Sequence, residues 1–148
     1  MTRLTFPLAN HHKHCDDLFA QAEERAYAGD WDGCTESFNC FRDELEAHFS
    51  AEEQRLFPAF EGATGSIGGP TQMMRLEHAQ MRELLAEMVS ALRRRDAAAF
   101  SGGAETLLIL MQQHNMKEEN ILYPMCDRTL QGQSINLEAA LRERLEMA

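Results

Sequence analysis

Along most of the chain, apolar residues recur every three or four positions and polar residues fill the positions between them. This spacing is typical of amphipathic helices, and no segment shows the strict alternation of a half-buried strand. The pattern predicts four long helices and a short fifth one, over about 9–28, 31–58, 71–95, 97–128 and from Asn136 onward. The predicted fold class is therefore all-α.

Turn and capping residues separate these helices. Asp30 is placed to cap the second helix and Asp96 the fourth, whereas residues 62–70, rich in glycine, are expected to form a flexible linker. Short turns within each helical pair and a longer connection between the pairs predict an up-down-up-down four-helix bundle over residues 1–130. Residues 131–148 are expected to form a short C-terminal helical extension, packed on the bundle or on a second subunit.

One histidine–carboxylate motif occurs twice, as His-x-x-x-Glu-Glu-x-x-Leu-(Phe/Tyr)-Pro beginning at His48 and at His114. In each copy a His and a Glu stand four residues apart and share one face of a helix. A single exposed pair of this kind stabilises a helix by about 0.2–0.5 kcal/mol and needs no further function. Two copies that both interrupt apolar core positions indicate a metal site instead.

The first carboxylate of each motif is the critical one. Glu52 and Glu118 fall on the apolar stripes of their helices, and burying an ionised Glu without a partner is very unfavourable. These two residues therefore require a cation or protons. The adjacent Glu53 and Glu119 lie off the stripe, so we expect them at the surface or, at most, holding a metal ligand in place.

Hairpin geometry then selects histidines on the other two helices. Two residues of an antiparallel pair reach the same height when both lie equally far from the turn. His11 and His48 satisfy this condition for the first pair, and His78 and His114 for the second, at about 25 Å from each turn. The four imidazoles are therefore expected at one level of the bundle.

The first helix also carries two other histidines. His14 lies a turn away and is the alternative helix-1 ligand, or a residue that holds a ligand in place, whereas His12 is expected at the surface. The predicted metal ligands are His11, His48, Glu52, His78, His114 and Glu118. Imidazole and carboxylate donors without thiolate suit iron or manganese, with zinc as a possible substitute in vitro, and two bridging carboxylates suit two metal ions.

Together these motifs resemble the hemerythrin-like (HHE cation-binding) domain over roughly residues 8–130. Within that family the resemblance is greatest to the di-iron domain of the iron–sulfur cluster repair (RIC) proteins, through both histidine–carboxylate motifs, the His-x-x-His pair of the first helix and the segment 69–78. The resemblance implies a hemerythrin-like bundle with two non-haem iron ions held by the six ligands above. It also implies that Glu52 and Glu118 bridge the two ions.

The chain departs from the oxygen-carrying hemerythrins at one position. Those proteins use a fifth histidine one turn before the position of His78, where this sequence has Met74. Methionine is not a normal iron ligand, so one coordination position is expected to be open or filled by water. The resemblance therefore implies a reactive or iron-handling centre and not an oxygen store.

Composition limits the partners and the compartment. The 24 acidic and 14 basic residues give a net charge of −10, which disfavours nucleic acid and anionic membranes as partners. No apolar run is long enough for a membrane helix and the first residues lack a signal-peptide core, so we expect a cytoplasmic protein. The four cysteines have no CxxC spacing and are expected to be free thiols.

Three functions are compatible with these features. The preferred hypothesis is a cytoplasmic non-haem di-iron protein that handles O₂, NO or peroxide under oxidative or nitrosative stress, or that stores and donates labile iron. The alternatives are a metal-dependent sensor or interaction module, and a metal-stabilised bundle without turnover. The sequence leaves open whether the protein is an enzyme and whether it forms a homodimer.

Overall fold

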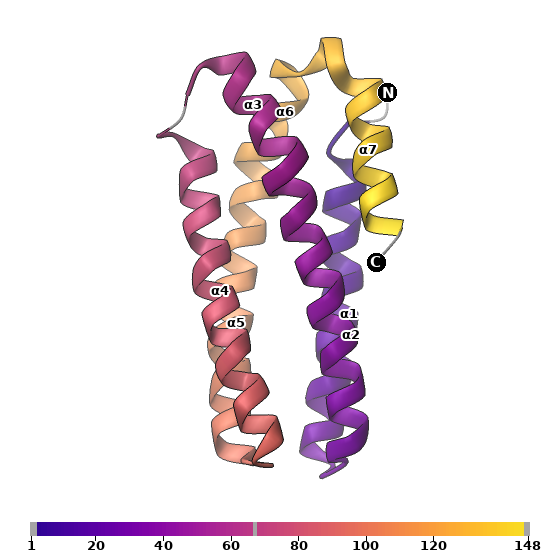
Figure 1. The fold of residues 1–148 in the computed structure, drawn as a ribbon, viewed down its shortest axis with the longest axis vertical. Coiled ribbons are helices and arrows are strands. Elements are labelled where there is room, and N and C mark those ends of the chain that lie inside the picture. The colour runs from indigo at the N-terminus through magenta and orange to yellow at the C-terminus, as the bar shows by residue number, and fades with distance from the viewer. Residues whose placement is uncertain (1–2, 67, 147–148) are drawn as a thin grey trace.

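The structure is a computed structural model that describes residues 3–66 and 68–146. The described residues form helices and the turns between them, with no strand in this part of the chain. Four long helices run side by side along the molecule (Figure 1), namely α1 (Phe6–Tyr27), α2 (Trp31–Ala51), α4 (Pro70–Arg93) and α5 (Ala97–Lys117). The predicted all-α fold, a four-helix bundle with a short additional C-terminal helix, is confirmed.

The two hairpins are closed by the same capping device. The side chain of Asp30 accepts a hydrogen bond of 3.0 Å from the backbone N–H of Gly33, and Asp96 accepts one of 3.0 Å from the backbone N–H of Ala99. Each bond satisfies a backbone donor that the first turn of a helix leaves without a partner. The tight turn before α2 uses Gly29 at a φ of 77°, a conformation that glycine adopts readily.

Both copies of the histidine–carboxylate motif contain a π-helical turn, in which backbone hydrogen bonds reach back five residues. These turns are η1 (Glu52–Leu56) and η2 (Glu118–Leu122), and they are followed by α3 (Phe57–Thr64) and α6 (Tyr123–Thr129). The predicted end of the second helix at Pro58 is therefore wrong. Proline occupies the first turn of α3, a position where a helix tolerates its missing N–H.

The connection between the two helical pairs is shorter than predicted. Residues 62–64 of the expected linker belong to α3, which ends at Gly65 in the left-handed conformation, with a φ of 71°. The next long helix begins at Pro70, and residue 67 lies outside the described residues. The connection from α3 to α4 lies at the end of the bundle opposite the two hairpin turns (Figure 1).

The core consists of two apolar clusters with a layer of polar side chains between them. The cluster nearer the hairpin turns includes Phe19, Phe38, Phe41, Met88 and Phe100. The cluster at the other end includes Leu8, Leu56, Phe60, Leu130 and Leu141. Because both clusters are buried, the polar layer lies inside the bundle, away from either end.

The C-terminal helix, α7 (Ser134–Glu146), follows the short helix η3 (Gln131–Gln133) and packs against α1, α2 and the turn η1 (Figure 1). Leu137 and Leu141 of α7 belong to the apolar cluster at the end of the bundle opposite the hairpin turns. The predicted apolar face of this helix therefore covers the bundle of its own chain, next to the π-helical turn that carries Glu52.

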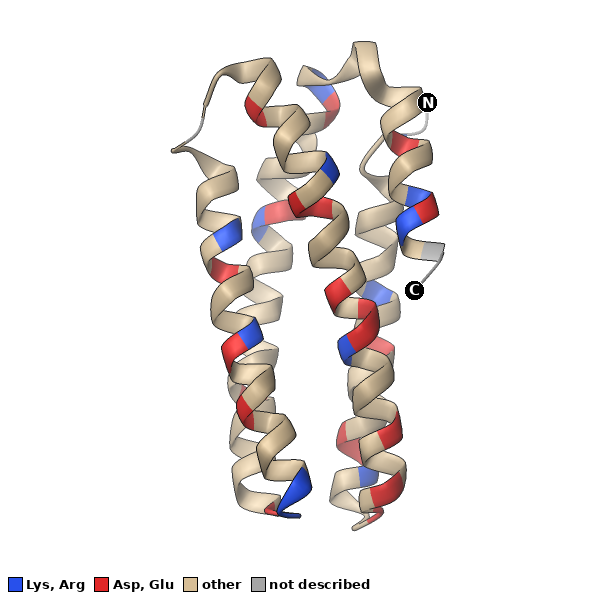
Figure 2. Cartoon of the chain, in the orientation of Figure 1, with Lys and Arg blue, Asp and Glu red and all other residues tan. Residues whose placement is uncertain are grey.

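Charged residues are spread along the bundle, and a band of acidic positions crosses it above its middle (Figure 2). Among the described residues, none of the helices has both the length and the apolar character needed to cross a membrane.

Candidate metal centre

Six buried histidine and glutamate side chains bring their donor atoms together in the polar layer between the two apolar clusters. They come from all four long helices and from the two π-helical turns, and they are His12, His48, Glu52, His78, His114 and Glu118. Glu52, His78 and Glu118 are 0 % exposed. Side chains of this kind are stable in a core only when other charges or hydrogen bonds compensate them.

The buried donors form two groups that share one carboxylate. Donor atoms of Glu52, His78, His114 and Glu118 all lie within 4.8 Å of one another, as do donor atoms of His12, His48 and Glu118. Within the first group, Nε2 of His78 lies 3.1 Å from Oε1 of Glu52. Within the second, Nε2 of His12 lies 3.1 Å from Oε1 of Glu118. Glu118 can therefore serve two metal ions at once.

Several of these atoms have no hydrogen-bond partner of acceptable geometry. They are Oε1 of Glu52, Oε2 of Glu118 and Nε2 of both His78 and His114. Unpaired buried polar atoms are rare in folded proteins, since each one loses its hydration without compensation. Four of them, converging on one point of the core, fit the donor set of a metal ion.

Three of the histidines are held from outside the group by carboxylates. Nδ1 of His12 donates to Oε2 of Glu119 at 2.6 Å, and Nδ1 of His78 donates to Oε2 of Glu53 at 2.7 Å. These bonds direct the opposite ring nitrogen, Nε2, toward the centre, as the outer partners of metal-binding histidines do. Glu53 and Glu119 thus occupy the positions expected from the sequence, off the apolar stripe and beside a candidate ligand.

The third outer carboxylate is Glu77 on α4, which the sequence analysis missed. Its Oε1 accepts a hydrogen bond of 2.7 Å from Nδ1 of His114, and its other oxygen pairs with Lys117. Glu77 directly precedes a predicted ligand in sequence but contacts a different one, on the neighbouring helix. The motif alone carries no signal of that cross-helix contact.

The centre has an uneven charge distribution. Burial and then the charge of Glu118 raise the pKa of Glu52 to about 7. Burial also raises the pKa of Glu118. The charge of His114 and the hydrogen bonds from neighbouring side chains outweigh burial, so the pKa of Glu118 lies well below its usual range. For His114, the charge and hydrogen bonding of Glu118 outweigh burial and raise the pKa to about 9. Protons thus compensate the buried carboxylates when no cation does.

The predicted position of His12 is wrong. His12, predicted at the surface, is buried and belongs to the donor group, whereas the structure places the predicted ligand His11 outside that group. The physical reason is the rotation of α1 about its own axis. Hairpin distances fix the height of a residue, and these two histidines differ in height by only about 1.5 Å. They differ in direction by about 100°, and only packing decides which of them faces the centre.

His11 and His14 instead form an outer chain with Glu44. Nδ1 of His11 lies 3.0 Å from Nδ1 of His48, and its Nε2 lies 3.5 Å from Oε2 of Glu44. The half-exposed His14 donates to Oε1 of Glu44 at 2.9 Å. The alternative ligand His14 therefore also lies outside the donor group.

Tyr123 is a further member of the site that the sequence analysis missed. Its hydroxyl donates to Oε2 of Glu52 at 2.7 Å and lies 3.1 Å from Oε1 of Glu118. The same oxygen lies 3.4 Å from Nε2 of both His12 and His48. The signal was present in the sequence, because the two copies of the motif have Phe and Tyr, respectively, at this position.

The π-helical turn explains why Tyr123 reaches the centre. In a regular α-helix a residue five positions after Glu118 would point about 140° away from it. In the π-helical turn the backbone N–H of Tyr123 bonds to the carbonyl of Glu118, which places the two residues on one face. The corresponding residue of the first motif, Phe57, stacks against His78 with ring centroids 5.7 Å apart.

Comparison with known proteins agrees with this geometry. The family model described as the hemerythrin HHE cation-binding domain matches residues 5–126. The chain belongs to the hemerythrin HHE family. Comparisons with curated proteins and with solved structures give no match. Membership of the hemerythrin HHE family, together with the buried His and Glu cluster, points to metal-ion binding, generally of iron.

Proposed function

We propose that this protein is a cytoplasmic non-haem di-iron protein that binds O₂, NO or peroxide, or that stores and donates labile iron. The observation that carries the proposal is the convergence of four imidazole Nε2 atoms on two buried carboxylates, in two groups that share Glu118. The proposed ligands are His12, His48, Glu52, His78, His114 and Glu118. His12 takes the place that the sequence analysis gave to His11.

The donor chemistry supports iron. All the proposed donors are nitrogen and oxygen atoms, a set that suits iron and, as substitutes, manganese or zinc. The nearby thiols do not compete for the metal, because burial raises the pKa of Cys15 and of Cys126 and keeps both protonated. Bound iron would supply the redox chemistry, whereas the protein supplies the ligands and the outer hydrogen bonds.

The charge balance supports a site for two cations. Two carboxylates inside the group neutralise half of the charge of two divalent ions. The outer carboxylates Glu53, Glu77 and Glu119 add negative charge within hydrogen-bonding distance of the imidazoles. This negative charge favours a pair of cations at the centre.

Met74 supports an open coordination position. It is 3 % exposed and packs in the apolar cluster at the end of the bundle opposite the hairpin turns, one helical turn before His78. Proteins of the hemerythrin family bind small ligands such as O₂ at their metal site, and an apolar side chain at this position leaves room for one. Phe49 stacks on His78 at 4.0 Å between centroids and shields that part of the centre from water.

Anaerobic purification followed by iron analysis tests the proposal. We expect two irons per chain and a change in the optical spectrum on adding O₂ or NO, because a reactive iron centre changes its charge-transfer absorption. His48→Ala and Glu118→Ala should each lower the iron content. His14→Ala is the matched control and should retain it, since His14 lies outside the donor group. Full iron content in both the His48→Ala and Glu118→Ala variants would contradict the site assignment.

One observation favours the second candidate, a metal-dependent sensor. Helix α7 packs on the turn η1, which contains Glu52. A displacement of Glu52 on metal binding would therefore be transmitted directly to α7. Amide hydrogen exchange of α7, with and without iron, tests this function. Faster exchange without iron, confined to α7, supports a sensor. Equal protection in both states, together with no optical response to O₂ or NO, leaves a metal-stabilised bundle without turnover.

A further inference from the structure

The internal repeat of the chain gives the bundle two equivalent surface grooves near the hairpin turns. Corresponding residues are 66 positions apart, as in His48 and His114 or in Asp30 and Asp96. One groove, of about 780 Å³, lies between α1 and α5, and the other, of about 350 Å³, lies between α2 and α4. Six residues that line the α1–α5 groove are the sequence counterparts of six that line the α2–α4 groove. Differences between the two grooves therefore come from their side chains.

The two grooves have opposite charge. Among the described residues that line it, the α1–α5 groove has two carboxylates, Glu23 and Glu24, and no basic side chain. Three arginines line the α2–α4 groove, namely Arg42, Arg93 and Arg95. Their counterparts in the repeat are an aliphatic, an aromatic and a glycine residue, Leu108, Tyr27 and Gly29. The fold does not need a basic residue at these positions, so the three arginines require a separate explanation.

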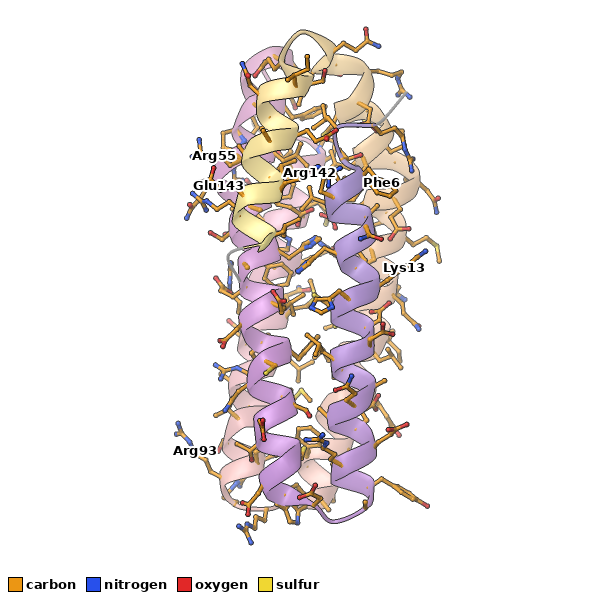
Figure 3. The ribbon with its side chains drawn as sticks, turned by 90° about the vertical axis from the view of Figure 1, so that its right-hand side faces the viewer. Phe6, Lys13, Arg55, Arg93, Arg142 and Glu143 are labelled. Carbon is orange, nitrogen blue, oxygen red and sulfur yellow. The ribbon has the colours of Figure 1, made fainter. Side chains whose placement is uncertain are left out.

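Two of these arginines have no acidic partner. Among the described residues, neither the half-buried Arg42 nor the exposed Arg93 forms an ion pair, although the chain has an excess of carboxylates. Figure 3 shows Arg93 near the hairpin end of the bundle, with its side chain directed away from the ribbon. Arg95 lies 3.5 Å from Asp32, but both side chains are largely exposed, and such pairs contribute little. All three guanidinium groups are therefore available to an anion from solution.

The backbone of Arg95 indicates that its side chain has a role of its own. Arg95 has a φ of 52° and is the one non-glycine residue with a positive φ in the described part of the chain. Its counterpart in the other hairpin turn is Gly29, with a φ of 77°. This conformation is unfavourable for a residue with a Cβ, and glycine is the usual residue at this position after a helix. The strained arginine is explained if its guanidinium serves the groove.

The rest of the lining suits a flat ring and its polar edge. Trp31 is partly exposed and forms an apolar wall with Val89 and Leu92, and Thr35 and Asn39 add a hydroxyl and an amide. An indole offers a flat face on which a nucleobase can stack, a contact that depends little on the identity of the base. A cavity of about 350 Å³ is at the lower end of the size range for small-ligand sites.

The charge of the lining suits a phosphate group. The three guanidinium groups, together with the single carboxylate of Asp32, leave a net charge of about +2. A phosphate monoester carries about −1.5 to −2 at pH 7. Guanidinium groups bind phosphate oxygens through two parallel hydrogen bonds, which gives these contacts both strength and orientation.

We propose that the α2–α4 groove binds a mononucleotide, with the phosphate group against the three arginines and the base against Trp31. A polynucleotide is disfavoured, because its further phosphates would meet a chain with a net charge of −10. Trp31 and His48 are about 25 Å apart along α2, so this site is separate from the metal centre and does not rest on its function.

Titration of the purified full chain with AMP tests the proposal. Trp31 is the only tryptophan in the chain, so its fluorescence reports on this groove. We expect a saturable change in that fluorescence. By calorimetry, AMP should bind at least about 10-fold more tightly than adenosine, which lacks the phosphate, or inorganic phosphate, which lacks the ring. The absence of a saturable change with AMP would overturn the proposal. Equal affinities for AMP and inorganic phosphate would show that the ligand is not a nucleotide.

Substitution of the unpaired arginines locates the phosphate. Arg42→Gln and Arg93→Gln should each weaken AMP binding by about 10- to 100-fold, because each removes a charged hydrogen-bond donor. Arg128→Gln removes the same charge from an exposed position of α6, at the opposite end of the bundle (Figure 1), and should bind as the wild type does. An equal loss of affinity in all three variants would show a general charge effect and contradict a site in this groove.

A third substitution separates the side chain of Arg95 from its backbone. Arg95→Gly copies the other hairpin turn, so it should raise the melting temperature by about 2–4 °C through relief of the backbone strain. The same change should weaken AMP binding by about 10-fold, since it removes one guanidinium group. Unchanged AMP affinity in Arg95→Gly would contradict the role of this residue in the groove.

Discussion

The hydroxyl of Tyr123 lies 2.7 Å from Oε2 of Glu52, although the two residues come from different halves of the repeated sequence. This contact joins the second π-helical turn to the first across the core of the bundle. The equivalent residue, Phe57, has no hydroxyl, so the two halves of the centre are chemically different. His12 and His48 have a phenol beside them, whereas His78 has an aromatic hydrocarbon ring.

Removing that hydroxyl should destabilise the metal-free protein. Tyr123→Phe leaves the buried Glu52 without its donor, which costs about 1–3 kcal/mol of unfolding free energy. Urea unfolding in the presence of a chelator measures the change. Tyr27→Phe is the control, because Tyr27 is 96 % exposed and its substitution should stay within about 0.5 kcal/mol of the wild type. Equal stability of both variants would show that the contact contributes nothing.

Stability of the metal-free protein should depend on pH through Glu52. Its pKa in the folded protein is raised to about 7 from a reference value of 4.5, so the folded state favours the protonated carboxyl. The resulting stabilisation is present below the reference value and is lost as the pH rises toward 7. Unfolding curves recorded between pH 4.5 and 8 should show this loss. Glu52→Gln, which cannot ionise, should flatten that part of the profile. An equally steep profile in the variant would assign the dependence to other groups.

The outer carboxylate on α4 should control metal affinity. Glu77→Gln keeps the size of the side chain but removes the charge that holds Nδ1 of His114, so iron affinity should fall by about 10- to 100-fold. Competition with a chelator measures the affinity. Glu83→Gln, on the exposed side of the same helix, serves as the comparison and should bind iron normally. Indistinguishable affinities would mean that His114 keeps its orientation without this carboxylate.

Helix α7 should contribute to the stability of the whole bundle. Leu141 is 0 % exposed, and Leu141→Ala leaves a cavity that lowers the unfolding free energy by about 2–5 kcal/mol. Denaturant titration gives the value, and the exposed Ile135→Ala should change it little. A loss below about 0.5 kcal/mol in Leu141→Ala would show that α7 is only loosely attached to the bundle.

The sequence by itself determined the helical architecture and most of the centre. The apolar period, the two Asp caps and the repeated motif are local features, and an i,i+4 pair such as His48 and Glu52 shares a face wherever a helix forms. Distance from the turn likewise fixes height within a hairpin. The structure accordingly gathers His48, Glu52, His78, His114 and Glu118 in one buried layer.

Only the tertiary structure decided which neighbours of those residues reach the centre. The rotation of α1, set by its packing against α2, α5 and α7, turns His12 inward and leaves His11 beside His48, outside the donor groups. The π-helical turns shift the register after each Glu and bring Tyr123 to the carboxylates. A change of one residue turns a helical side chain by about 100°, so direction depends on the packing of the whole bundle and spacing along the chain cannot specify it.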